Sequence, residues 1–182
     1  MNASHDIRPE LRKQATNMLK ELPPSAREAL LIKCWISHDA RWFMAVAGEY
    51  GMPAANRLNK IAAHEVGKVE ARRLMRALEL APVTTCEGYL LTQELFIGLL
   101  GQELIDYSVH TVSRDTFEVR VVRCFAYDNT VTAGISHQAD CGVWARVTGW
   151  MESLELNYSL SPPLGKCQMA QGEDCAYRIT LS

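Results

Sequence analysis

Apolar side chains recur at helical spacing through the first 80 residues, and prolines and a glycine interrupt the pattern. Residues 9–21 predict a short helix that ends before Pro23 and Pro24. Ser25 is followed three positions later by Glu28, a spacing typical of a capping box. A second helix is therefore predicted to start at Ser25.

The second and third helices are predicted to form an antiparallel hairpin. The second helix carries its apolar positions at Leu31, Cys34, Trp35, Trp42 and Val46. It should end at Gly51, and Pro53 suits the first turn of the third helix. Helical spacing then continues to about Leu80, so the tight turn of the hairpin lies near Met52.

The pattern changes after residues 81–85, which form the predicted boundary between two regions. Residues 88–100 predict a short apolar helix. Apolar and polar positions then alternate around residues 107–111 and again around residues 117–121. Alternation of this kind predicts two antiparallel strands joined by a turn.

The last third of the chain predicts two helices and two strands. The helices are expected over residues 124–134 and 142–160, and the strands over residues 164–169 and 175–181. The whole order predicts an α+β fold, in which an N-terminal helical hairpin precedes a four-stranded antiparallel sheet packed against helices. We expect residues 1–85 to be a helical region and residues 86–182 an α/β domain that binds metal and ligand, together in one compact unit.

Composition narrows the classes of function. A net charge of −2 supplies no basic field for a phosphate backbone, so a nucleic-acid partner is not expected. No run of 18 apolar residues predicts a membrane span, and residues 1–12 lack the apolar core of a signal peptide. The protein is therefore expected in the cytoplasm. Six cysteines in a reducing compartment favour metal ligation, catalysis or simple burial over disulfides.

Four of the cysteines gather in the last third of the chain, at Cys124, Cys141, Cys167 and Cys175. If the last two strands form a hairpin around Gly172, Cys167 and Cys175 face each other with Cβ atoms about 4.5–5.5 Å apart. Cys141 should start a helix, where the backbone amides lower the pKa of a thiol. Four thiolates suit a closed tetrahedral zinc site, and an iron–sulfur cluster uses the same donors. Buried inert thiols are the alternative to a metal.

The spacing of these cysteines resembles a known family. Cys167 follows Cys141 by 26 positions, Cys175 follows by eight more, and Gly172 lies between the last two. This pattern resembles the 4-vinyl reductase-like domain, the effector-sensing part of phenol-responsive transcription activators. An early helix that contains Trp and Asp before a Cys-rich end also resembles the L-2-amino-thiazoline-4-carboxylic acid hydrolase-like proteins. The matching segment is Trp35-Ile36-Ser37-His38-Asp39-Ala40-Arg41-Trp42.

The resemblance to the sensors implies a mixed α/β fold, a structural zinc and a buried pocket for a small apolar or aromatic ligand. It implies that the three matching cysteines hold the zinc. Those sensors supply a further ligand from a carboxylate three residues before the second cysteine, and Leu164 occupies that position here. Cys124 is therefore the expected fourth ligand. The hydrolase-like resemblance implies a hydrolase as the alternative.

A second polar site is predicted in the helical hairpin. With the turn near Met52, His38 and Asp39 come level with His64 and Glu65. Two histidines and two carboxylates at one level suit a second metal or an acid–base pair, and a solvated polar band is the alternative. The candidates for lining a ligand pocket are Trp35, Trp42 and Trp144.

Two functions follow from these patterns. One is a zinc-stapled binding module with a small-molecule ligand and a homodimer or partner surface. The other is an enzyme that uses Cys141 as a nucleophile or the second polar site as a catalytic metal centre. The sequence leaves open whether the protein is catalytic.

Overall fold

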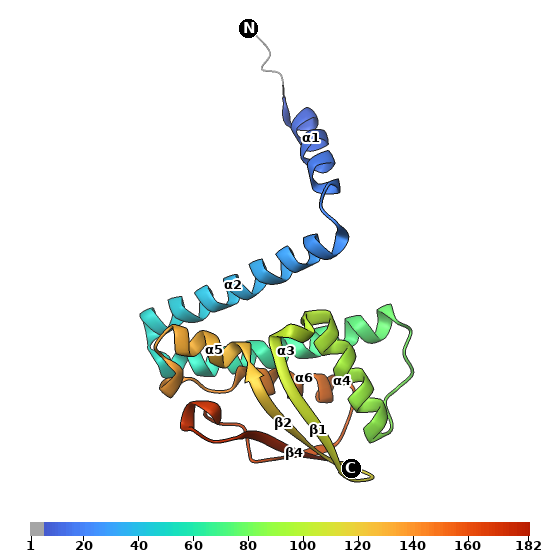
Figure 1. Ribbon diagram of the computed structural model, residues 1–182, viewed down its shortest axis with the longest axis vertical. Helices are drawn as coiled ribbons and strands as arrows, with labels where there is room; N and C mark the ends of the chain where they lie inside the picture. Colours follow the sequence, from blue (N-terminus) through green and yellow to red (C-terminus); the bar gives the residue numbers. More distant parts are fainter. Residues whose placement is uncertain (1–5) are drawn as a thin grey trace. The chain divides into compact units, whose positions relative to one another are not determined.

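A computed structural model describes residues 6–182 of the chain. The chain divides into two compact units, the first ending at Trp42 and the second running from Phe43 to Ser182. Residue 85, where the sequence predicts a boundary, lies inside the second unit. The relative placement of the two units is not determined (Figure 1), so each is described by itself.

The first unit is helical. Helix α1 spans Arg8–Lys20, and helix α2 spans Pro24–Tyr50 and crosses into the second unit. The predicted capping box differs from what is found, because α2 begins at Pro24 and Ser25 lies inside the first turn. Proline suits that first position, since its ring fixes a helical φ and the missing N–H would have no partner there. No residue from 6 to 42 is buried.

The second unit is built around two helices that cross closely. Helix α3 (Met52–Ala77) contains Gly67, and helix α6 (Gly142–Ser153) contains Gly149. A Cβ atom on either glycine would collide with the facing backbone, at the carbonyl of Arg146 for Gly67 and at that of His64 for Gly149. The two backbones are therefore in direct contact, which only residues without a side chain permit.

A four-stranded antiparallel sheet completes the second unit, and the α+β prediction is confirmed (Figure 1). Its strands are β1 (Ile105–Ser113), β2 (Thr116–Cys124), β3 (Tyr158–Ser161) and β4 (Cys175–Leu181). Their order across the sheet is β1-β2-β4-β3. The remaining helices are α4 (Cys86–Leu100) and α5 (Phe125–Thr132), with short 3-10 turns at Gln102–Leu104, Ser136–Gln138 and Met169–Gln171.

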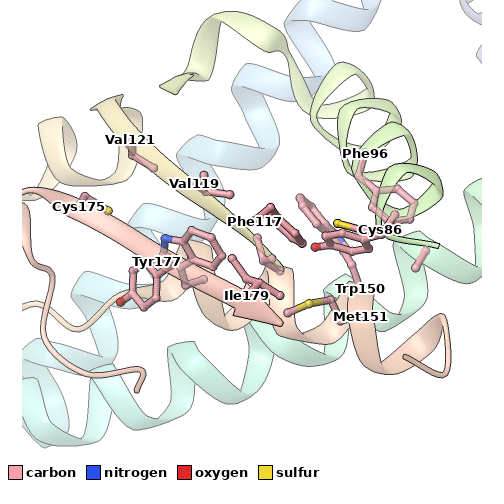
Figure 2. Packing of buried hydrophobic residues seen from close by; sticks show 14 of the residues in the cluster. Cys86, Phe96, Phe117, Val119, Val121, Trp150, Met151, Cys175, Tyr177 and Ile179 are labelled. Carbon is pink, nitrogen blue, oxygen red and sulfur yellow. The ribbon is translucent and has the colours of Figure 1, made fainter. Parts of the chain in front are cut away.

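Helix α6 lies between the sheet and α3, and its side chains form the centre of the core (Figure 2). Trp144 stacks on Tyr177 of β4 with ring centroids 4.3 Å apart. Trp150 packs against Phe96 of α4 at 5.0 Å. On the other side of α6, Arg146 pairs with Glu70 of α3. This arrangement explains why seven of the helix's twelve residues are buried.

The predictions for residues 142–169 need correction. The helix expected over 142–160 ends at Ser153, and Tyr158–Ser161 forms β3 instead. The strand expected over 164–169 is absent; β3 pairs with β4, so that Tyr158 lies opposite Leu181. Helix α6 ends because Glu155 adopts a left-handed φ of 58°. Glycine usually marks such a stop, and the sequence has glutamate there.

Among the described residues, no helix is both long enough and apolar enough to span a membrane.

Candidate functional site

Two of the four late cysteines occupy N-cap positions. Cys124 precedes α5 and Cys141 precedes α6. Neither thiol makes a capping hydrogen bond. The backbone amides of Tyr127 and Ala126 nevertheless act to lower the pKa of Cys124, and that of Trp144 acts to lower the pKa of Cys141. Each thiol therefore faces the amide end of a helix, where negative charge is favoured.

Cys175 reaches the same region from the sheet. It lies opposite Val121 in the ladder of β2 and β4, and it is buried on the core face with Tyr177. Burial raises the pKa of its thiol, and the indole N–H of Trp144 beside the sulfur partly offsets this rise. Trp144 is thus the link between the two cysteines on either side of it, because its backbone amide faces Cys141 and its ring faces Cys175.

Cys167 is positioned by a short antiparallel contact between two loops. Its N–H donates to the carbonyl of Ala139 (3.2 Å), and the N–H of Cys141 donates to the carbonyl of Gly165 (3.0 Å). The residues between these bonds, Asp140 and Lys166, form the bridge. Cys141 and Cys167 therefore lie on neighbouring strands of one bridge, although 26 positions separate them in the sequence.

Side chains alternate across extended backbone, so this bridge has two sides. Asp140 and Lys166 share the outer side, where the Lys166 ammonium lies 3.1 Å from the Asp140 carboxylate. Cys141 and Cys167 lie on the other side, where Cys141 packs against the core. The same short segment therefore carries charged side chains on one side and sulfur on the other.

The predicted hairpin between Cys167 and Cys175 is wrong. Cys167 is in a loop followed by a 3-10 turn, and Cys175 pairs with β2 rather than with the segment before the turn. Gln168 connects the two segments in place of a ladder. Its side chain accepts from the N–H of Ala176 (2.9 Å) and donates to the carbonyl of that residue (3.3 Å).

Helix α3 holds the outer side of the bridge. Asn56, which is 5% exposed, donates to the carbonyl of Gln138 (2.7 Å) and accepts from the N–H of Asp140 (3.0 Å). The Lys60 ammonium lies 2.7 Å from the Asp140 carboxylate. Burial would raise the pKa of Asp140, but Lys60 and Lys166 outweigh it and hold that pKa below its ordinary value. Asp140 is consequently charged and anchored.

The prediction that Cys141 has a lowered pKa is also wrong. Burial raises the pKa of Cys141 to about 12, and this outweighs the lowering by the Trp144 amide. Burial likewise raises the pKa of Cys175 to about 11 and raises that of Cys124. Without a bound cation these thiols are protonated at neutral pH, so the position of Cys141 gives no activated nucleophile.

The four cysteines form one electrostatic group. A negative charge on any one of them raises the pKa of a neighbour, and such interactions connect every pair among Cys124, Cys141, Cys167 and Cys175. Across residues 6–182, no three His, Cys, Asp or Glu side chains are oriented so that they could hold a metal ion. A metal at this cluster therefore requires the thiols to move from the positions that the structure gives them.

Comparison with known families identifies a family for the chain but no function. The model of a family of unknown function, DUF6125, matches residues 27–130, which is more than half of the chain. The chain belongs to this family. The segment that DUF6125 describes includes Cys124 but ends before the other three late cysteines. No curated protein matches the chain.

The residues of the predicted second polar site fall in both units. His64 lies on α3, where its Nε2 is 2.9 Å from a carboxylate oxygen of Glu152 on α6, and its Nδ1 is 3.5 Å from Glu65. Lys68 completes this group, 2.8 Å from Glu152. His38 and Asp39 lie in the first unit, so their predicted pairing with α3 stays a prediction.

The three tryptophans predicted to line a pocket differ in environment. Trp144 is buried beside Cys175 and Tyr177, whereas Trp42 is 65% exposed and Trp35 is 37% exposed. Of the three, Trp144 is the one that contacts the cysteine cluster.

Sequence reasoning missed Tyr89 on α4. It is fully buried, and its hydroxyl is the one buried side-chain polar atom without a hydrogen-bond partner among the described residues. Its ring packs on Phe117 at 5.7 Å. An unsatisfied buried hydroxyl costs about 1–3 kcal/mol. No motif marks Tyr89, because its burial depends on how α4 packs against the sheet.

Proposed function

We propose that this DUF6125 protein is a small-molecule-binding protein of the sensor type, located in the cytoplasm, whose four late cysteines bind one structural zinc ion. The observation that carries the proposal is the bridge of Asp140 with Lys166, which brings Cys141 and Cys167 together from distant parts of the sequence. Cys124 and Cys175 lie within electrostatic reach of this pair. These thiols come from two helix N-caps, one loop and one strand. Burial alone does not require sulfur at all four places.

The chemistry of the donor set fits zinc. Thiolates are soft ligands, and four of them form a closed tetrahedral shell with no position for substrate. The amides at Cys124 and Cys141 and the indole N–H at Cys175 each favour the thiolate form. Because burial raises the pKa of Cys124, Cys141 and Cys175, these thiols are protonated beforehand. Zinc binding must therefore release protons, and the affinity should fall as the pH is lowered.

A zinc ion there would tie together the start of α5, the start of α6, the start of β4 and the loop that contains Cys167. Its role would be structural, and ligand binding would take place elsewhere in the second unit. Trp144 extends from the cluster toward the core, and the orphan hydroxyl of Tyr89 offers a hydrogen bond to a small phenol or other aromatic ligand. The resemblance to 4-vinyl reductase-like domains implies the same two features, a structural zinc and a separate pocket for the ligand.

Metal analysis of anaerobically purified protein tests the zinc. We expect about one zinc per chain, and loss of most of it in Cys141→Ser or Cys175→Ser. Cys86→Ser is the matched control, since Cys86 is also a buried cysteine but lies at the start of α4. Protein that holds less than one metal per chain, with all six thiols titrating freely, would contradict the proposal. Absorbance near 400 nm would instead identify the bound group as an iron–sulfur cluster.

Calorimetric titration with phenol tests the ligand. We expect Tyr89→Phe to weaken phenol binding by about tenfold, as the loss of one hydrogen bond predicts, with zinc content unchanged. Tyr158→Phe is the control, since Tyr158 is a half-buried tyrosine of β3 in the same unit. Equal effects of the two substitutions, or no heat with wild-type protein, would remove phenols as the ligand class and leave the zinc proposal standing.

A further inference from the structure

Helix α2 carries an apolar stripe that the zinc and ligand proposals do not use. At 100° per residue, Leu31, Trp35, His38 and Trp42 fall within an arc of about 60°. Their spacing of four, three and four residues is that of the core positions of a coiled coil. Leu31 and Trp42 are each 65% exposed. The stripe, called the seam below, therefore lies on the surface of the first unit and has the spacing of a helix-pairing face.

The stripe continues into a groove where α1 meets α2. The groove has a volume of about 560 Å³ and lies wholly within the first unit. Its lining residues are Leu19, Lys20, Leu22, Pro24, Arg27, Glu28 and Leu31. Leu31 belongs to both features, so the groove and the seam form one continuous apolar surface with charged side chains at its rim.

Two copies of the seam can face each other in antiparallel orientation with matching side chains. If two copies of α2 pair antiparallel about a two-fold axis between Ile36 and Ser37, facing positions sum to 73. Leu31 then faces Trp42 of the second copy, and Trp35 faces His38 of the second copy. Each large side chain meets a partner, and each Trp42 enters the end of the groove next to Leu31. A parallel pairing would place Trp42 on Trp42 and leave both grooves empty.

We propose that this face of α2 is the interface of an antiparallel homodimer, in which Trp42 of each copy docks in the α1–α2 groove of the other. The guanidinium of Arg27 lines that groove and is suited to stack on the indole. This proposal does not depend on zinc or on the small-molecule ligand.

The area available sets the expected strength. Aromatic side chains bury about 150–250 Å² each, so the exposed parts of Trp35 and Trp42 contribute about 400 Å² over two copies. The leucines of the groove add to this, and specific interfaces bury about 1,200 Å² or more. The two tryptophans alone fall well below that area, so we expect a weak, reversible dimer that forms at high protein concentration.

Sedimentation velocity of the full-length chain over a range of concentrations tests the interface. We expect Leu31→Gln and Trp42→Gln each to weaken the dimer by about tenfold or more. Leu30→Gln is the matched control, because Leu30 is a neighbouring leucine on the same helix, 51% exposed, but about 100° away from the seam. Circular dichroism verifies that each variant keeps its helices.

Cross-linking tests the register, and it does so even if a polar variant fails to fold. Leu31→Cys and Trp42→Cys chains, each with Cys34→Ser, are mixed under mild oxidation by a glutathione disulfide buffer. Antiparallel pairing predicts disulfide-linked dimers in the mixture and few in either chain alone. Linkage within each chain alone, a wild-type protein that stays monomeric, or equal weakening by Leu30→Gln would overturn the proposal.

Discussion

The two units of this chain use apolar side chains in opposite ways. From residue 6 to residue 42 no side chain is buried, although the segment contains large residues such as Leu31 and Trp42. In residues 43–182 the large apolar side chains instead converge on α6. The hydrophobic effect stabilises a fold only where apolar area leaves water. The buried apolar area that stabilises the fold therefore lies in the second unit, whereas the large apolar side chains of the first unit are exposed.

The strongest test of this difference removes a large side chain from each unit. Phe117→Ala should lower the free energy of unfolding by about 3–5 kcal/mol, because the side chain is fully buried and leaves a cavity. Leu30→Ala in the first unit should change it by less than about 0.5 kcal/mol. Urea denaturation monitored by tryptophan fluorescence measures both. Comparable losses would show that residues 6–42 share the core.

Ion pairs provide a second comparison. Glu70 pairs with Arg146 and accepts from the indole N–H of Trp150 (3.2 Å), in a setting where both charged side chains are about one-seventh exposed. Glu70→Gln should cost about 2–4 kcal/mol, since a charge remains in a dry environment. The pair of Asp6 and Arg8 in the first unit is short (2.6 Å) but open to water. Asp6→Asn should therefore leave the thermal midpoint unchanged in differential scanning calorimetry.

The pH dependence of stability tests how much Asp140, on the outer side of the bridge, stabilises the second unit. The pKa of Asp140 is lower in the folded chain than its ordinary value of 3.8. Its contribution to stability is thus complete above that value and is lost as the pH falls through the folded pKa. Asp140→Asn should be less stable than wild type at neutral pH, and the gap should close in acid. A gap that stays constant from pH 6 to pH 2 would contradict this linkage.

The smallest effect is expected at the end of α6. Glu155 has a φ of 58°, a left-handed conformation that costs a non-glycine residue about 1 kcal/mol. Glu155→Gly should therefore raise the thermal midpoint by a few degrees. Glu152→Gly in the same helix is the control and should lower it, because Glu152 is in the helix and binds Lys68. A lowered midpoint in both variants would show that Glu155 makes a compensating contact.

Much of the fold could be predicted from the sequence because its signals are local. Helical spacing, Pro53 and strand alternation depend on neighbouring residues, and α3, β1 and β2 follow them. Strand β3 could not be found this way, since Leu154 and Leu156 continue an apolar pattern past a stop that no glycine marks.

Part of the sequence reasoning behind the candidate site was wrong. The four cysteines do interact with one another, but the expected hairpin is replaced by a bridge from Asp140 to Lys166. The contact of Asn56 with Gln138 spans 82 positions, and no local pattern encodes it. The pKa of Cys141 was misjudged because burial, which depends on the whole fold, outweighs the helix amides that the sequence does show.

The crossing of α3 and α6 restricts how related chains can vary. Gly67 and Gly149 each lie where a single added carbon would collide with the opposite backbone. A relative that keeps this crossing must keep glycine at both positions, whereas Gly48, with open space around it, is free to change. Family members in which both glycines are replaced should therefore be members whose two helices have moved apart. In such members Cys141, at the start of α6, would move as well.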